Sequence, residues 1–217
     1  VCLSLMMIDY NLSFIPSIWL SMNRKNWLIV GISGVTCSGK STLAKELHKK
    51  FDDSIVIHQD SYFLSPDDPR HVKIPALNHI NWEILSSLDM NKMYSDILKL
   101  IESKPKRSDK SDKELRRVLI LEGFLLFGFK PISNLCELKY FLTLNKEECW
   151  KRRSIRTYSP ADVPGYFDAF VWPEYLKYLS VIKQNDQAST ELIFLDGTIE
   201  SHEMVQMVLT KIQDLLS

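Results

Sequence analysis

A glycine-rich motif constrains this chain more than any other feature of its sequence. Residues 34–41 read GVTCSGKS and match the phosphate-binding pattern GxxxxGK[ST]. In such a loop the glycines let backbone N–H groups turn toward a phosphate, and the following helix points its positive end at the anion. Lys40 would reach the β- and γ-phosphates, and the Ser41 hydroxyl would ligate Mg²⁺. The nucleotide-binding set predicted here is Gly34, Val35, Thr36, Cys37, Ser38, Gly39, Lys40, Ser41 and Thr42.

The segments around the motif predict the fold class. An apolar run, WLIVGI at 27–32, precedes the loop, and an amphipathic helical pattern follows it. Further strand-like runs occur at 54–58, 117–124, 138–144 and 191–197, with helical patterns after Asp89, from Lys146, at 172–184 and at 199–216. Strands that alternate with helices are typical of a parallel sheet. We therefore predict an α/β fold with a five-stranded parallel sheet flanked by helices, and a lid.

Composition bounds the domain count and the partners. The chain has 217 residues, 45% hydrophobic and 25% charged, with a formal net charge of zero. This length predicts one domain, placed at 26–217. Residues 1–25 are predicted to be an extension outside the fold, because Asp9, Asn11 and Pro16 interrupt its apolar character. The chain lacks the excess of basic residues that is typical of nucleic-acid-binding proteins. No segment resembles a signal peptide or a membrane span.

Cysteine usage indicates the compartment. The four cysteines lie far apart and form no CxxC pair. A disulfide framework or zinc site is therefore disfavoured, and a reducing, cytoplasmic location is expected. The sequence does not determine the oligomeric state, for which a monomer is favoured.

Two carboxylates follow strand-like runs and would meet the phosphate loop at one edge of a parallel sheet. Glu122 ends the run VLIL, where it would hold a magnesium-bound water. Asp60, in VIHQDSYF, follows the second run and would accept a hydroxyl proton and contact the Mg²⁺ shell. With Ser41 they form the predicted metal site. By its own pattern Glu122 is equally compatible with an ordinary residue at the end of a strand, and the pattern around Asp60 by itself favours an ordinary residue at the start of a loop.

A basic segment predicts a lid at about 149–170. The segment CWKRRSIRTYSPADVPGYFD carries Arg152, Arg153 and Arg156. In a continuous helix, Arg152 and Arg156 would share one face, and Arg153 would point about 100° away. Two of these cations would then clamp phosphates while the third faced the acceptor. The aromatic and proline-rich continuation favours a closing lid over a solvated surface helix.

Other classes of P-loop protein fit less well. A GTPase needs a guanine-reading NKxD motif, but Asn145-Lys146-Glu147-Glu148 ends in Glu, and no DxxG follows the second or third run. A non-catalytic binding protein on the same scaffold remains an alternative. It would have no need of an acceptor site and a lid, so those features favour a kinase.

From about Asn26 to the C-terminus, the chain resembles the nicotinamide riboside kinases, within the uridine kinase-like P-loop kinases. The resemblance lies in GISGVTCSGKSTLAK, HQDSYF, NWEILSSLDM, ILEGFLLF, ECWKRRSIRTY, PGYFDAFVWPEYLKY and FLDGT. It implies phosphorylation of the 5′-hydroxyl of nicotinamide riboside, and of nicotinic acid riboside, by ATP and Mg²⁺ for NAD synthesis. A uridine/cytidine kinase is the nearest alternative.

The resemblance also assigns residues. Asp60 corresponds to the catalytic base, Arg153 to a ribose-binding arginine, and Trp82 and Tyr158 to aromatic residues that stack on the pyridine ring. A pyridinium between two such rings gains roughly 0.5–2 kcal/mol from cation–π contact. The implied substrate set is Asp60, Tyr62, Phe63, Trp82, Glu83, Arg153, Tyr158 and Ser159. The additional ATP contacts it implies are Arg152, Arg156, Ile199, Glu200 and Ser201.

One departure from the family pattern concerns the ribose. The family places Asp beside the first stacking aromatic residue, where its carboxylate binds the 2′- and 3′-hydroxyls, but this chain has Glu83. The added methylene shifts the carboxylate by about one bond length, and misplacement near 1 Å is costly in a binding site. The competing interpretation is that Trp82 and Glu83 simply begin a helix, with Glu favoured in its first turn.

Overall fold

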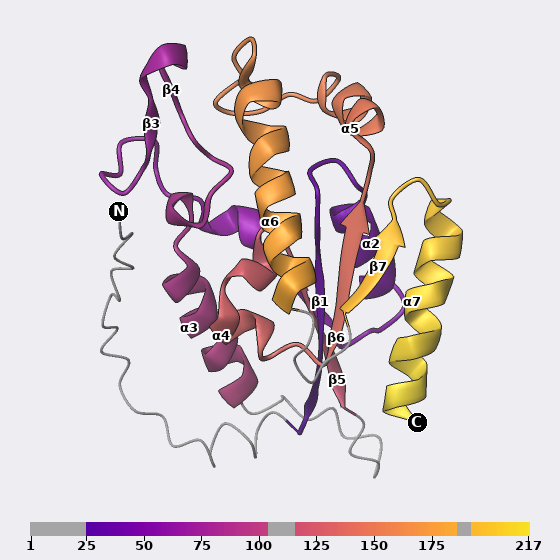
Figure 1. The fold of residues 1–217 in the computed structure, drawn as a ribbon. Helices are drawn as coiled ribbons and strands as arrows, with labels where there is room; N and C mark the ends of the chain where they lie inside the picture. The colour runs from indigo at the N-terminus through magenta and orange to yellow at the C-terminus, as the bar shows by residue number, and fades with distance from the viewer. Residues whose placement is uncertain (1–24, 104–115, 186–191) are drawn as a thin grey trace.

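A five-stranded sheet with helices on both faces forms the centre of the molecule (Figure 1). The computed structural model describes residues 25–103, 116–185 and 192–217. The strands lie in the order β2-β5-β1-β6-β7, and each pairing is parallel. Their bounds are β1 Trp27–Gly34, β2 Ile55–His58, β5 Arg117–Glu122, β6 Leu138–Thr143 and β7 Leu192–Asp196. The predicted fold class is confirmed, whereas the proposed extension lies, apart from Lys25, outside the described residues.

The central strand β1 shows why the strand-like runs are continuously apolar. All eight of its residues are buried. Leu28, Val30 and Ile32 pack into a cluster with side chains of α2 (Lys40–His48) and α7 (Ser201–Leu216). Trp27 and Ile29 belong to the cluster on the opposite face. Helices on both faces exclude water from both sides of the strand, so no polar alternation is needed.

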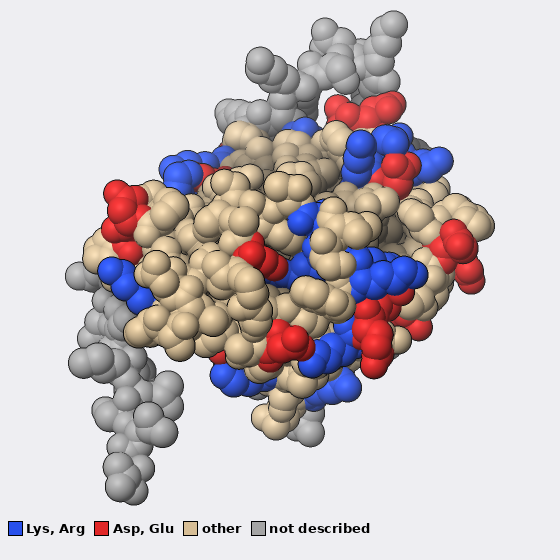
Figure 2. Space-filling model, turned by 90° about the horizontal axis from the view of Figure 1, so that it is seen from above, with Lys and Arg blue, Asp and Glu red and all other residues tan. Residues whose placement is uncertain are grey.

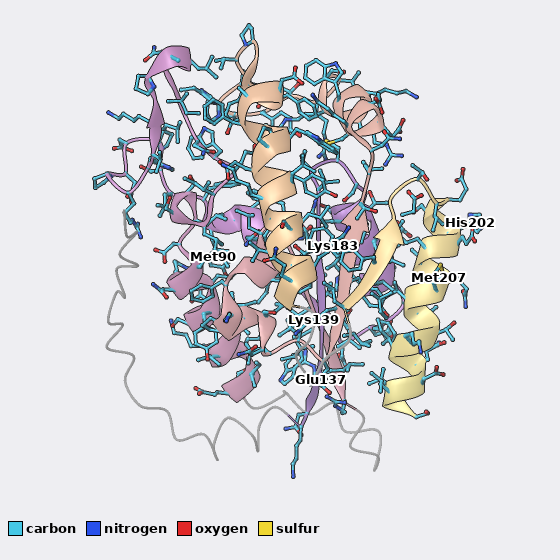
Figure 3. The ribbon with its side chains drawn as sticks, viewed as in Figure 1. Met90, Glu137, Lys139, Lys183, His202 and Met207 are labelled. Carbon is cyan, nitrogen blue, oxygen red and sulfur yellow. The ribbon has the colours of Figure 1, made fainter. Side chains whose placement is uncertain are left out.

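Other helices cover the second face of the sheet. Their bounds are α3 Met90–Glu102, α4 Lys130–Ser133 and α6 Trp172–Asn185. Asp89 caps α3 as predicted, because its side chain accepts a hydrogen bond from the Lys92 backbone N–H at 2.9 Å. Met90, at the start of α3, is buried among the core side chains, whereas Met207 on α7 is exposed (Figure 3). Within the described ranges, no helix combines the length and apolar character needed to cross a bilayer.

The proline-rich segment after β2 folds over the carboxyl edge of the sheet. Regular structure is absent from most of it, as its prolines predict, but β3 (Lys73–Ile74) and β4 (His79–Ile80) form a small antiparallel hairpin. The Asn81 backbone N–H donates to the Val72 carbonyl at 2.9 Å and closes the base of this hairpin. The chain then returns toward the sheet through Trp82 and Glu83.

The lid begins on the other side of the same edge. It consists of α5 (Lys146–Arg153), a proline-containing loop and the π-helical turn η5 (Phe167–Val171), which leads into α6. The phosphate loop, the hairpin segment and the lid all gather where the parallel strands end (Figure 1). Ligands of open α/β sheets bind at this edge, so the fold itself locates the candidate site.

Candidate active site

The phosphate loop has the backbone that its glycines predict. Gly34 and Gly39 have φ of 131° and 96°, and Cys37 adopts φ of 61°. A Cβ atom on Gly34 would collide with the backbone of Leu142, so only glycine fits there. Gly39 forms the N-cap of α2 and supplies no side-chain cap. The first N–H groups of α2 therefore remain available at its positive end, as an anion-binding loop requires.

Lys40 lies at the start of α2 with its ammonium group buried. Its Nζ donates to the Val35 carbonyl oxygen at 2.7 Å, and only 8% of the residue is exposed. Burial lowers the pKa of Lys40, while the nearby charges of Glu122 and Asp60 act in the opposite direction. The motif thus places a cation beside two carboxylates and against the loop, where its positive charge would attract a phosphate.

Glu122 and Ser41 are brought together from β5 and α2. The Ser41 hydroxyl donates to the two carboxylate oxygens of Glu122, at 3.2 and 3.3 Å, and Glu122 is almost fully buried. His58 Nδ1, at the end of β2, lies 2.7 Å from Glu122 Oε1. Hydroxyl and carboxylate oxygens are the donors that Mg²⁺ prefers. The three predicted metal-site residues, Ser41, Glu122 and Asp60, therefore fit a hard divalent cation by their chemistry.

Asp60 follows β2 in the short helix η1 (Gln59–Tyr62) and faces the same cavity. Burial among its neighbours raises the pKa of Asp60, and the charge of Glu122 raises it further. Lys40, His58 and Arg156 oppose this rise. A carboxylate with a raised pKa is a better proton acceptor than an ordinary surface aspartate.

Trp82 and Glu83, from the hairpin segment, line the same cavity, and the part of it around them is the candidate acceptor end. Glu83 Oε1 accepts a hydrogen bond from Arg153 Nη2 at 3.2 Å, and the Glu83 side chain is 11% exposed. The Trp82 ring meets Phe63 edge-on, with ring centroids 5.7 Å apart. Neither Trp82 nor Glu83 begins a helix: they precede the short helix η3 (Leu85–Ser87) and its N-cap, Ile84. The helix-start interpretation is therefore wrong.

The lid arginines depart from the predicted arrangement. Helix α5 ends at Arg153, so Arg152 and Arg156 do not share a helical face. Both nevertheless reach the phosphate loop, because Arg152 Nη1 donates to the Cys37 carbonyl oxygen at 3.4 Å and Arg156 Nη1 to Cys37 Sγ at 3.7 Å. Neither residue that directly follows Arg153 is a glycine or a proline, so the local sequence does not explain why the helix ends there. The helix ends where the Arg153 side chain becomes buried and makes its contacts.

Arg153 itself connects several parts of the site. Its guanidinium lies over the Tyr158 ring, 4.5 Å from the centroid, and its Nη1 donates to Thr36 Oγ1 at 3.2 Å. Only 5% of the Arg153 side chain is exposed. It therefore joins the phosphate loop to the Glu83 end of the site.

A single cavity of about 570 Å³ contains most of the predicted residues. In the space-filling view of this edge, basic side chains gather near the middle of the face with acidic ones beside them (Figure 2). The predicted residues that line the cavity are Thr36, Cys37, Gly39, Lys40, Ser41, Thr42, Asp60, Phe63, Trp82, Glu83, Glu122, Arg152, Arg153, Arg156, Tyr158 and Ser159.

The remaining predicted residues lie outside the cavity lining. These are Gly34, Val35, Ser38, Tyr62, Ile199, Glu200 and Ser201. The first three shape the phosphate loop from within. The Tyr62 hydroxyl donates to Asp96 Oδ2 at 3.4 Å, toward α3, and Ile199 packs against the core under α7. The cavity therefore contains both the phosphate loop and the acceptor end without Tyr62 or residues 199–201 in its lining.

Sequence reasoning missed two residues that support the site. The Tyr166 hydroxyl accepts a hydrogen bond from the Trp82 backbone N–H at 2.9 Å, and Asp162 pairs with Arg153. Both lie in the lid segment, but a single aspartate in a proline-rich loop forms no recognisable pattern. Trp150, which had no predicted role, packs on Phe167 with ring centroids 5.0 Å apart.

Comparison with known proteins shows which sequences and folds this chain resembles. A family model described as an AAA domain matches residues 30–173. Human nicotinamide riboside kinase 1 is 42% identical over 184 residues, which cover 83% of this chain and 89% of that protein. A uridine kinase from Lactobacillus johnsonii is 27% identical over 216 residues, covering 90% and 99%. Thymidylate kinase from Candida albicans shares the fold, with a TM-score of 0.53 at 16% identity and coverage of 87% and 92%.

Proposed function

This chain belongs to the nicotinamide riboside kinase family, and we propose that it transfers the γ-phosphoryl group of ATP to the 5′-hydroxyl of nicotinamide riboside. Members of the family are phosphotransferases, and the P-loop implies the use of ATP. The observation that carries the proposal is one cavity with the phosphate loop at one end and Trp82, Glu83 and Arg153 at the other. Nicotinic acid riboside would be a second substrate, and the products would serve NAD synthesis.

The acceptor end supplies contacts for both parts of a pyridine riboside. Trp82 and Tyr158 line the cavity and would stack on the ring, and a cationic pyridinium gains from contact with aromatic faces. Glu83 Oε1 is engaged by Arg153, and among the described residues Oε2 has no hydrogen-bond partner. We assign Oε2 to the vicinal ribose hydroxyls. The longer Glu side chain would then be tolerated because Arg153 holds its carboxylate.

The phosphate end supplies positive charge and backbone donors. The N-terminus of α2 and Lys40 would hold the β- and γ-phosphates, while Arg152 and Arg156 would approach them from the lid. Ser41, Glu122 and Asp60 would hold Mg²⁺, which when bound supplies charge neutralisation between the phosphates. Keeping these groups in a partly enclosed cavity strengthens their interaction with the transferred group.

Asp60 is assigned the proton of the 5′-hydroxyl. Asp60 lines the same cavity as Lys40 and Glu83. Its raised pKa favours proton acceptance as the hydroxyl oxygen attacks the γ-phosphorus. Removal of that proton and orientation of the two substrates are the contributions we assign to the chain itself.

ADP release over a small panel tests this function. The panel contains nicotinamide riboside, nicotinic acid riboside, uridine and cytidine, each with ATP and Mg²⁺, and a no-nucleoside control. We expect turnover with the pyridine ribosides. Preference for uridine or cytidine would favour the pyrimidine-nucleoside kinase, and no release with any nucleoside would favour a binding protein on this scaffold. We also propose that the enzyme is cytoplasmic and monomeric. Cell fractionation tests the location, and light scattering tests the oligomeric state.

A further inference from the structure

The carboxylate of Asp162, in the lid, pairs with Arg153 at the acceptor end of the cavity. Asp162 accepts hydrogen bonds from Arg153 through both of its oxygens: Nε to Oδ2 at 2.6 Å and Nη2 to Oδ1 at 2.9 Å. Two parallel bonds between a guanidinium and a carboxylate are both strong and directional. Asp162 lines the cavity and its side chain is 28% exposed. It therefore sets the orientation of Arg153 at the point where the lid meets the substrate space.

This pairing leaves the acceptor end with an unbalanced charge. Arg153 is one cation shared between two carboxylates, Asp162 and Glu83, and the shorter, two-bond contact is the one to Asp162. Burial disfavours the charge on Arg153, but its bond to Asp162 and the charge of Glu83 raise its pKa, so it stays protonated. With both carboxylates ionised, the three groups together carry one net negative charge.

Ionisation of Glu83 is linked to the charge of whatever binds beside it. Burial raises the pKa of Glu83, Arg153 lowers it, and Asp162 raises it again. A positive ring next to Glu83 would lower this raised pKa. A cationic ligand and the ionised form of Glu83 therefore favour each other, whereas a neutral ligand brings no such compensation.

The other cations of the cavity do not cancel this charge at the acceptor end. Arg152 and Arg156 contact the phosphate loop at Cys37, and Lys40 bonds to the Val35 carbonyl oxygen. These groups face the position of the nucleotide phosphates, whose own charge is negative. The charge balance at the acceptor end is therefore set mainly by Arg153 and its two carboxylates, and the charge of Asp60 makes it more negative still.

We propose that Asp162 is a specificity-determining residue, which by occupying Arg153 leaves Glu83 to balance a positive ring and so makes the cavity select a nucleoside with a cationic base over a neutral one of the same shape. The proposal rests on the proposed function, because it assumes that the nucleoside lies between Trp82, Glu83 and Tyr158. Asp162 acts through Arg153 and Glu83, so it is a positioning residue.

A matched ligand pair tests the proposal. Nicotinamide riboside carries a pyridinium charge, and its 1,4-dihydro form has the same ribose and carboxamide without that charge. Calorimetry would give Kd for both ligands with the unmutated protein and with Asp162→Asn, Asp162→Glu and Asp168→Asn. Asp168 is an exposed lid-side aspartate paired with Lys146 at 2.7 Å and does not line the cavity, so it is the control.

We expect the unmutated protein to prefer the cationic riboside. Asp162→Asn should reduce that preference roughly tenfold, the order expected when one charge is removed from the wall of a partly buried site. Asp162→Glu keeps the charge and should keep the preference, even if the altered length weakens binding of both ligands. Asp168→Asn should leave the preference unchanged.

Two results would overturn the inference. One is an equal loss of affinity for both ligands in a folded Asp162→Asn protein, which would mean that Asp162 only orders the lid. The other is a lost preference in Asp162→Glu as well, which would mean that shape rather than charge matters. ADP release with ATP and nicotinamide riboside tests the proposed function separately, so turnover with an unchanged Kd ratio would refute the inference alone.

Discussion

Replacing Glu83 by Gln tests the part of the site where this chain departs from the family pattern. Gln keeps the length and shape of the side chain but removes its charge. In the structure Glu83 Oε1 accepts from Arg153 Nη2 at 3.2 Å, and the assigned role of Oε2 is to accept from the ribose hydroxyls. We expect the variant to bind nicotinamide riboside more weakly and to fold normally.

The structure sets the expected magnitudes. A hydrogen bond to a charged acceptor contributes about 1.5–3 kcal/mol, so loss of the carboxylate should raise Kd by roughly 10- to 150-fold. Stability should change little, because Arg153 retains its two-bond contact with Asp162 and is not left as an unpaired buried charge. The melting temperature of Glu83→Gln should therefore stay close to that of the unmutated protein.

Comparison of two ribosides separates the ribose contact from other effects. Kd would be measured by calorimetry for nicotinamide riboside and its 2′-deoxy analogue, with the unmutated protein, Glu83→Gln and Glu174→Gln. Glu174 pairs with Lys177 on α6, away from the cavity lining, and serves as the control. Any effect of the lost charge on the ring is common to both ribosides and cancels in their ratio. Equal losses for the two ribosides would refute the ribose contact, and a large fall in melting temperature with unchanged discrimination would indicate a structural role.

Three further predictions concern the phosphate loop and the base. Lys40→Ala should abolish ADP release while circular dichroism shows an intact fold, because Lys40 bonds only a loop carbonyl; near-normal turnover would remove the phosphate-loop assignment. Asp60→Asn should lower kcat by at least about 10²-fold with little change in riboside Kd. Because its pKa is raised above 3.8, kcat/KM of the unmutated enzyme should fall as pH drops through that higher value, and a profile unaltered by Asp60→Asn would place the base elsewhere. Gly34→Ala should destabilise the fold by roughly 1–3 kcal/mol more than Gly165→Ala in denaturant unfolding, because both glycines have positive φ but only the Gly34 Cβ would meet backbone atoms.

The sequence alone determined the features that depend on local rules. Buried strands are continuously apolar, so the run at 27–32 predicted β1. The spacing of Gly34, Gly39 and Lys40 predicted the phosphate loop that follows this strand. Asp89 was recognisable as a helix cap because a capping side chain acts within three residues. Parallel strands end at one edge, so Asp60 and Glu122 could be assigned to the same region before any coordinates were known.

Only the tertiary structure shows which side chains pair with one another at the acceptor end. Glu83, Arg153 and Asp162 come from the hairpin segment, the end of α5 and the lid loop, and no local pattern relates them. Helical periodicity placed Arg152 and Arg156 on one face, but α5 ends at Arg153, whose buried side chain makes long-range contacts that periodicity does not contain. The hydrogen bond of Ser41 to Glu122 and the strand order that allows it likewise depend on pairing between distant segments. Local sequence specifies which elements form, whereas the energies of burial and charge pairing arise only once those elements meet.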